Sequence, residues 1–120
     1  WRSKVTQFYA DLRETWERLV EEILLGKTVE RFRAEVKTLS LKSVVVDDDD
    51  YTAIYFAMKR VSERSGHDMA NGRNLPTPKL SDMKDDLDVI DKYRVVLKKK
   101  LDAAETRRKK LEQPPVAEVA

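Results

Sequence analysis

The stretch "VTQFYADLRETWERLVEEILL", residues 5–25, decides the fold class of this 120-residue chain. Apolar side chains recur in it at spacings of three and four residues, which places them along one face of a helix. This stripe consists of Val5, Phe8, Tyr9, Leu12, Trp16, Leu19, Val20, Ile23 and Leu24. The pattern predicts a helix over residues 4–25, which ends at Gly26, a residue that readily adopts positive φ.

Two further helices are expected in the middle of the chain. Thr28 can cap the first of them, and its predicted inward face holds Val29, Phe32, Val36 and Leu39. Residues 44–46 are predicted to form a buried connector. The aspartates at 47–50 offer caps and favourable charge for the next helix, which should end near Ser65 and Gly66. The inward face of that helix is predicted to hold Tyr51, Ile54, Tyr55, Met58 and Val61.

The second half of the chain indicates a loop followed by one long helix. Residues 67–77 contain an Asn-Gly pair and a proline, and Pro78 follows directly; all of these favour turns. A helix is predicted over residues 78–112, with Arg94 and Arg108 at heptad positions that usually hold apolar residues. Its predicted apolar positions are Leu80, Met83, Leu87, Ile90, Leu97, Leu101, Ala104 and Leu111. We therefore expect an all-α bundle of about four helices with a long C-terminal helix: one domain at 1–113 and a tail at 114–120.

Composition restricts the kinds of chemistry that the chain can perform. Charged residues make up 38% of it, the net charge is +2, there is no cysteine, and His67 is the only histidine. Thiolate sites and disulfides are excluded, and a zinc site would have to depend on carboxylates. No apolar run reaches the roughly 20 residues that span a bilayer. We expect a cytoplasmic protein without membrane contact, and the abrupt start at Trp1 indicates a piece of a longer chain.

The Gly-Lys-Thr at residues 26–28 matches the end of a phosphate-binding loop, but the match is incomplete. That loop requires another glycine five residues before the second one and a strand before it. Glu21 occupies this position, where a carboxylate would repel phosphate, and the preceding residues are predicted to be helical. We interpret Gly26-Lys27-Thr28 as a helix end, a solvated lysine and a helix cap.

Three residues form the best candidate for catalysis. On the predicted second helix, Arg31 and Glu35 lie one turn apart on one face, although the same spacing also gives ordinary surface ion pairs. His67 follows Gly66, and Asp68 can orient its ring. A metal-free ribonuclease needs a base for the ribose 2′-hydroxyl, a cation for the phosphorane and an acid for the leaving 5′-oxygen. Glu35, Arg31 and His67 supply these three groups.

The order Arg31-x-x-x-Glu35 followed by His67 resembles the Arg…Glu…His set of bacterial anticodon nucleases of the PrrC and RloC type. Two further segments are similar to the C-terminal region of the AAA-type, SMC-like ATPases that include these nucleases. They are "FYADLRETWERLVEEILL" with "RFRAEV" after it, and the "GHD" of residues 66–68. The resemblance covers most of residues 5–100.

The resemblance implies an antiphage or stress effector that cuts tRNA in the anticodon loop, leaving a 2′,3′-cyclic phosphate and a 5′-hydroxyl. It also implies that ATP binds only to an ATPase portion outside this chain, so that no cofactor is expected here. Such domains are grouped with the helical HEPN ribonucleases, but the spacing from Arg64 to His67 is shorter than the HEPN signature. The catalytic arginine is therefore Arg31, Arg64 or both.

Basic residues suggest where RNA would bind. Lys98, Lys99 and Lys100, together with residues 107–110, concentrate positive charge on the last helix, and Arg64 and Arg73 lie on either side of His67 in the sequence as further candidates for RNA binding. The alternative is a solvated helix end whose cations complement the helix dipole. Tyr51, Tyr55 and Trp16 can stack on a base, although their helical spacing also fits core packing.

A second hypothesis explains the same helices without catalysis. In it, the chain is a regulatory or dimerisation module of an SMC-like or AAA ATPase. The expected partners are tRNA under the first hypothesis and the ATPase portion under either, with a homodimer possible under both. The two hypotheses differ in whether His67 meets Arg31 and Glu35 in one cleft.

Overall fold

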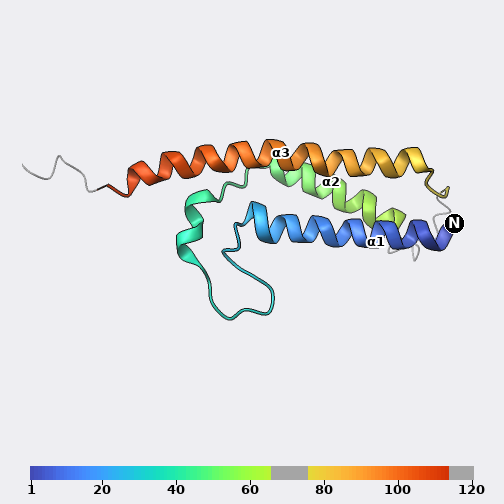
Figure 1. The fold of residues 1–120 in the computed structure, drawn as a ribbon, viewed down its shortest axis with the longest axis horizontal. Helices are drawn as coiled ribbons and strands as arrows, with labels where there is room; N and C mark the ends of the chain where they lie inside the picture. The colour runs from blue at the N-terminus through green and yellow to red at the C-terminus, as the bar shows by residue number, and fades with distance from the viewer. Residues whose placement is uncertain (66–75, 114–120) are drawn as a thin grey trace, which may run out of the picture.

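A computed structural model describes residues 1–65 and 76–113 of the chain and shows an all-α fold (Figure 1). Helix α1 (Arg2–Leu19) continues directly into a π-helical turn, η1 (Val20–Leu24). A 3₁₀ helix, η2 (Thr38–Ser43), precedes α2 (Asp48–Arg64), and α3 (Leu80–Leu111) follows. The described ranges contain no strand apart from an isolated bridge between Val29 and Val36. The predicted all-α bundle with a long C-terminal helix is confirmed.

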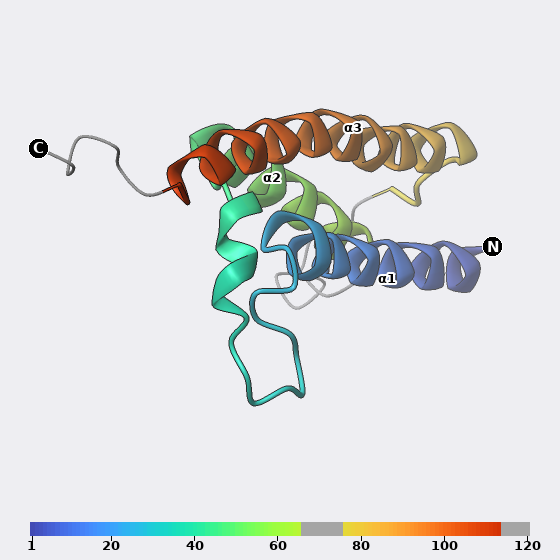
Figure 2. The same ribbon diagram turned by 60° about the vertical axis from the view of Figure 1, so that its left-hand side comes forward.

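The three long helices lie side by side in an elongated body of 70 × 31 × 21 Å (Figures 1 and 2). Its radius of gyration is 18.9 Å, whereas a compact domain of this length has about 14 Å. Helix α3 runs along α1 and α2 and extends beyond them. The shared core is formed by Val5, Tyr9, Leu12, Trp16, Leu19, Leu24, Ala57, Val61, Ile90, Leu97 and Leu101.

The apolar stripe of α1 is buried as the sequence predicts. Tyr9 and Trp16 leave at most 1% of their surface exposed, and the helical segment ends at Leu24. Gly26 follows with φ of +53°, which confirms its expected role. A Cβ atom at this position would lie 3.1 Å from the Ser43 hydroxyl, so that glycine also allows η2 to approach the end of α1.

Helix α2 begins with reciprocal hydrogen bonds between Asp47 and Asp50. Each backbone N–H donates to the other residue's carboxylate at 3.1 Å, which is a capping box. The predicted inward face is only partly correct, because Tyr51 and Tyr55 are 67% and 49% exposed. The buried or partly buried stripe instead contains Asp50, Ile54, Ala57, Met58 and Val61. Asp50 faces inward because it bonds to residues of α3. Tyr51 and Tyr55 therefore lie on the outer side of α2.

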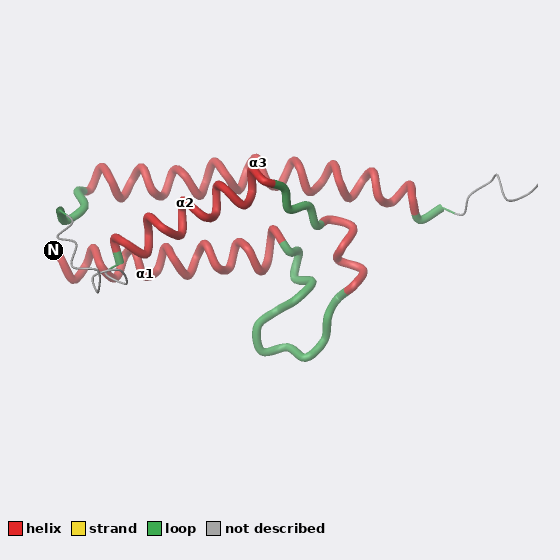
Figure 3. Tube along the Cα trace, turned by 180° about the vertical axis from the view of Figure 1, so that it is seen from behind, coloured by secondary structure: helices red, strands yellow, loops and turns green. Residues whose placement is uncertain are grey.

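The predicted second helix, starting at Thr28, is wrong: residues 28–37 form a loop that projects from the bundle (Figure 3). The Arg31 N–H donates to the Glu21 carboxylate at 2.8 Å, and the Lys37 N–H donates to the Thr28 carbonyl at 2.7 Å. These bonds replace those that a helix would make. The apolar residues expected to face inward are exposed instead: Val29, Phe32, Val36 and Leu39.

Helix α3 begins at Leu80, two residues later than Pro78, where the sequence predicted its start, and the Lys79 N–H donates to Asp82 at 2.8 Å. Ile90, Leu97, Leu101 and Ala104 are buried. Three positions expected to be apolar contacts are instead exposed: Leu80, Leu87 and Leu111.

Arg108 has a structural role at its heptad position. Its Nη1 donates to the carbonyl oxygens of Leu41 at 2.8 Å, Lys42 at 3.3 Å and Val44 at 2.5 Å. These carbonyls are at the end of η2, where a helix leaves acceptors without partners. Arg108 therefore fastens η2 to α3.

In the part of the chain that the structure describes, no helix carries an apolar stretch of the length and purity needed to cross a membrane.

Candidate functional site

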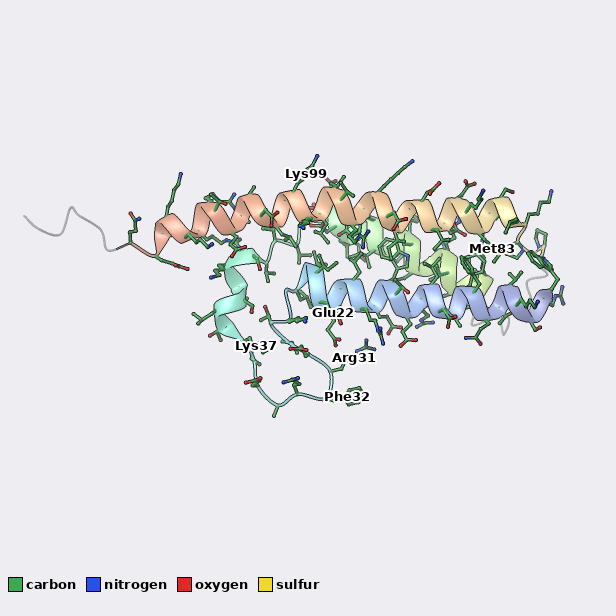
Figure 4. All side chains as sticks on the ribbon, viewed as in Figure 1. Glu22, Arg31, Phe32, Lys37, Met83 and Lys99 are labelled. Carbon is green, nitrogen blue, oxygen red and sulfur yellow. The ribbon has the colours of Figure 1, made fainter. Side chains whose placement is uncertain are left out.

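Arg31 is anchored to the end of the α1 segment (Figure 4). Its Nε donates to Glu21 Oε2 at 3.0 Å, the same oxygen that accepts the Arg31 backbone N–H, and its Nη1 lies 4.0 Å from Glu17 Oε2. The backbone hydrogen bond from Arg31, followed by its side chain and charge, lowers the pKa of Glu21. The guanidinium thus has a defined position although it is about half exposed.

Glu35 lies in the same loop and is well exposed, with its Oε1 4.0 Å from Arg33 Nη1. The expectation that Arg31 and Glu35 share one helix face is wrong, because this segment is not helical. His67 and Arg73 lie outside the described residues. The described chain before His67 ends with Arg64, the last residue of α2, and its cap Ser65.

A chain of polar contacts on one side of α1 connects the Arg31 loop with the last turns of α2. Arg31 contacts Glu17, Glu17 lies 3.8 Å from Arg13, and Arg13 donates to the Ser62 hydroxyl at 3.3 Å. Glu17 and Arg13 are one helical turn apart. Arg31 and the last turns of α2 therefore contact the same side of α1. The contact on α2 is Ser62, three residues before Ser65.

A groove of about 600 Å³ lies between α1 and α2 on this side. The residues lining it are Arg13, Val20, Val46, Tyr51, Ile54, Tyr55, Met58, Lys59 and Ser62. The Tyr51 and Tyr55 rings are stacked, with centroids 5.9 Å apart and planes inclined by 26°. Aromatic faces can stack on nucleobases, and the cations of Arg13 and Lys59 can contact phosphates.

Two of the three aromatic residues proposed from the sequence for base stacking line the groove, and the third does not. Tyr51 and Tyr55 are available at its wall, whereas Trp16 is 1% exposed and stacks on Tyr93 inside the bundle. Sequence reasoning missed Arg13, Lys59 and Ser62 as groove residues. No sequence signal marks them, because the groove results from the packing of α1 against α2.

Arg64 belongs to a buried polar cluster rather than to the groove. Its Nη1 donates to Asp86 Oδ2 at 2.5 Å and to the Tyr9 hydroxyl at 3.0 Å, and the Tyr9 hydroxyl donates to the same Asp86 oxygen at 2.5 Å. Arg60 Nε lies 2.9 Å from Asp86 Oδ1 as an ion pair without hydrogen-bond alignment. Burial, followed by the hydrogen bond to Asp86, raises the pKa of Tyr9 to about 12. Arg64 is thus engaged inside the bundle, whereas the Arg31 side chain is about half exposed.

Lys100 is also held inside the bundle. Its ammonium pairs with Asp50 and, at 3.1 Å, with Asp47, while the Tyr93 hydroxyl donates to Asp50 Oδ1 at 2.8 Å. This second cluster fixes α2 against α3. Lys98 and Lys99 are exposed, and Figure 4 shows Lys99 directed away from the other helices. Of the three lysines proposed to bind RNA, these two have accessible side chains.

Within residues 1–65 and 76–113, no group of three or more His, Cys, Asp or Glu side chains is arranged to hold a metal ion. Neither a protein-family model, nor a curated protein, nor a solved structure matches this chain. The interpretation of the groove therefore depends on the residues and geometry of the chain itself.

Proposed function

We propose that this chain is a metal-independent endoribonuclease domain that cleaves tRNA in the anticodon loop and binds the RNA along the α1–α2 groove. The polar path from Arg31 through Glu17 and Arg13 to Ser62 supports this proposal most directly. This path connects the loop that carries Arg31 and Glu35 with the last turns of α2, at Ser62. tRNA as substrate implies a cytoplasmic protein, and the resemblance implies an antiphage or stress role.

Each of the three residues has a distinct chemical role in the proposal. Glu35 accepts the proton of the ribose 2′-hydroxyl, which attacks the adjacent phosphorus. Arg31 stabilises the negative charge that develops on the phosphorane oxygens. His67, in its protonated form, gives a proton to the departing 5′-oxygen. The products are a 2′,3′-cyclic phosphate and a 5′-hydroxyl.

The groove supplies binding for the bases and phosphates next to the cleaved bond. An anticodon loop presents unstacked bases, which aromatic rings can accept, as Tyr51 and Tyr55 would do at the groove wall. Arg13 and Lys59 lie beside these rings and would contact phosphates. The exposed Lys98 and Lys99 and, in the sequence, Arg73 would extend this positive surface.

The test is incubation of the 120-residue chain with total tRNA in EDTA, followed by mapping of the RNA ends. We expect cleavage in the anticodon loop with cyclic phosphate ends, and a loss of at least about a hundredfold in rate for His67→Ala or Glu35→Gln, the scale of general acid–base catalysis. Glu105→Gln, on α3, is the matched control and should cleave like the wild type.

Cleavage that His67→Ala and Glu35→Gln leave unchanged would overturn the assignment of the site. Cleavage that depends on added divalent metal would overturn the reaction class. Circular dichroism of each variant establishes that the helical content is retained.

The non-catalytic alternative is favoured by one observation on η2. Leu39 and Leu41 are 85% and 54% exposed, an apolar surface typical of a contact with another protein. In this second proposal the chain docks on the ATPase portion of a longer protein or on a second copy. It predicts no tRNA cleavage and, where the partner is a second copy, a dimer that Leu39→Ser with Leu41→Ser converts to a monomer in sedimentation equilibrium.

A further inference from the structure

Phe32, in the loop at residues 28–37, is an aromatic residue in an unusual position. Phe32 is fully exposed, and its φ is +67°, which residues other than glycine seldom adopt. Figure 4 shows Phe32 at the outer end of the loop, away from the long helices. Neither the exposure of the ring nor the backbone conformation contributes to stability, so that a role in binding is the better explanation.

The loop that carries Phe32 is held in a defined shape. Val29 and Val36 form a bridge near its base, where the Lys37 N–H donates to the Thr28 carbonyl. Lys37 Nζ also pairs with Glu30 at 3.0 Å. On the other side, the Glu21 carboxylate accepts hydrogen bonds from both the backbone N–H and the side-chain Nε of Arg31. These contacts present the Phe32 ring in one place without covering it.

The residues beside Phe32 indicate the kind of partner. Arg31 and Arg33 flank it, and their side chains are 48% and 59% exposed. An exposed aromatic ring whose two chain neighbours are arginines suits an unstacked nucleobase with its neighbouring phosphates. An apolar protein surface would contact the ring but would have to desolvate both arginines together with the exposed Glu35 that lies beside Arg33.

We propose that Phe32 is a stacking platform for an unpaired base of a single-stranded RNA, with Arg31 and Arg33 on the adjacent phosphates. This inference deepens the proposed function, because it depends on RNA as the ligand of the same loop that carries Glu35. The platform makes the site selective for single-stranded over double-stranded RNA, since a base within a duplex offers no free face.

The test uses a fluorescein-labelled single-stranded oligoribonucleotide with 2′-O-methyl groups throughout, which binds but cannot be cleaved. Fluorescence anisotropy should show that Phe32→Ala weakens binding roughly tenfold, while Phe32→Trp and Phe32→Tyr bind like the wild type. Leu39→Ala removes another exposed apolar side chain and is the matched control. A duplex of the same sequence should bind equally weakly to the wild type and to Phe32→Ala.

Wild-type affinity in Phe32→Ala, or no binding of the oligonucleotide by the wild type, would overturn the inference. Unchanged RNA binding together with loss of self-association in Phe32→Ala would assign the ring to a protein contact instead. Because the probe cannot react, failure of the nuclease proposal is seen separately: natural tRNA stays intact while binding still depends on Phe32.

Discussion

At the scale of single residues, two buried aspartates determine how the helices meet. Asp86 on α3 accepts hydrogen bonds from Tyr9 of α1 and Arg64 of α2, and Asp50 on α2 contacts Tyr93 and Lys100 of α3. Each carboxylate is 3% exposed at its side chain, so that its charge requires these partners. The two clusters align the helices in register at separate points along the bundle.

Removing the charge of Asp86 should destabilise the fold strongly. Asp86→Asn removes the negative charge and replaces one of the two acceptor oxygens, which Tyr9, Arg64 and Arg60 share, with an NH₂ donor. We expect a loss of about 2–3 kcal/mol in the free energy of unfolding. Asp85→Asn changes the exposed neighbour and should stay within about 0.5 kcal/mol of the wild type. Urea unfolding followed by circular dichroism measures both; equal stability of the two variants would contradict the role of Asp86.

The raised pKa of Tyr9 predicts a loss of stability at alkaline pH. The pKa is about 12 in the folded chain against a reference of 10.0, so that the unfolded chain releases this proton first. The stabilising contribution is complete below about pH 10 and is lost as the pH rises toward about 12. Tyr9→Phe should therefore lose less stability than the wild type over this interval. Burial also raises the pKa of Tyr93, but that residue is present in both chains and cancels in the comparison.

At the scale of elements, the sequence predicts best where one apolar stripe is long. Helix α1 buries its stripe as predicted, whereas α3 buries only the middle of its stripe, from Ile90 to Ala104. The aspartates at 47–50 correctly predict the start of α2. Val29, Phe32, Val36 and Leu39 show a similar spacing, but the first three lie in a loop and only Leu39 lies in a helix, the 3₁₀ helix η2. The reason is a contact from outside the segment, the capture of the Arg31 N–H by Glu21, which local periodicity cannot reveal.

Arg108 shows how an element can depend on one side chain from another helix. Arg108→Ala removes the donor to three carbonyls at the end of η2, so that amide hydrogen exchange at residues 38–44 should accelerate about tenfold or more. The exposed neighbour Arg107 provides the control variant, Arg107→Ala. Protection factors in η2 that are the same in both variants would show that η2 is fixed by other contacts.

At the scale of the whole molecule, the elongated shape distributes the groups of the candidate site over separate segments. The loop with Arg31 and Glu35 meets α1 near Glu17 and Glu21, and the last turns of α2 meet α1 near Arg13. The sequence identified the residue types for the proposed chemistry. The sequence did not reveal the α1–α2 groove, because Arg13, Tyr55 and Lys59 come together only through the packing of α1 on α2.

The proposed function requires Glu35 and His67 to act on one phosphate and therefore to lie close together, and the composition of the chain permits a direct test. There is no native cysteine and one histidine. A nitroxide attached to Ala34→Cys should therefore broaden a single, unambiguous imidazole proton signal in the NMR spectrum. The same label on Lys109→Cys, near the far end of α3, is the control.

We predict strong broadening of the His67 signal from position 34 and none from position 109. A His67 signal that stays sharp with the label at position 34 would contradict the account, since Glu35 and His67 could not then act on the same phosphate.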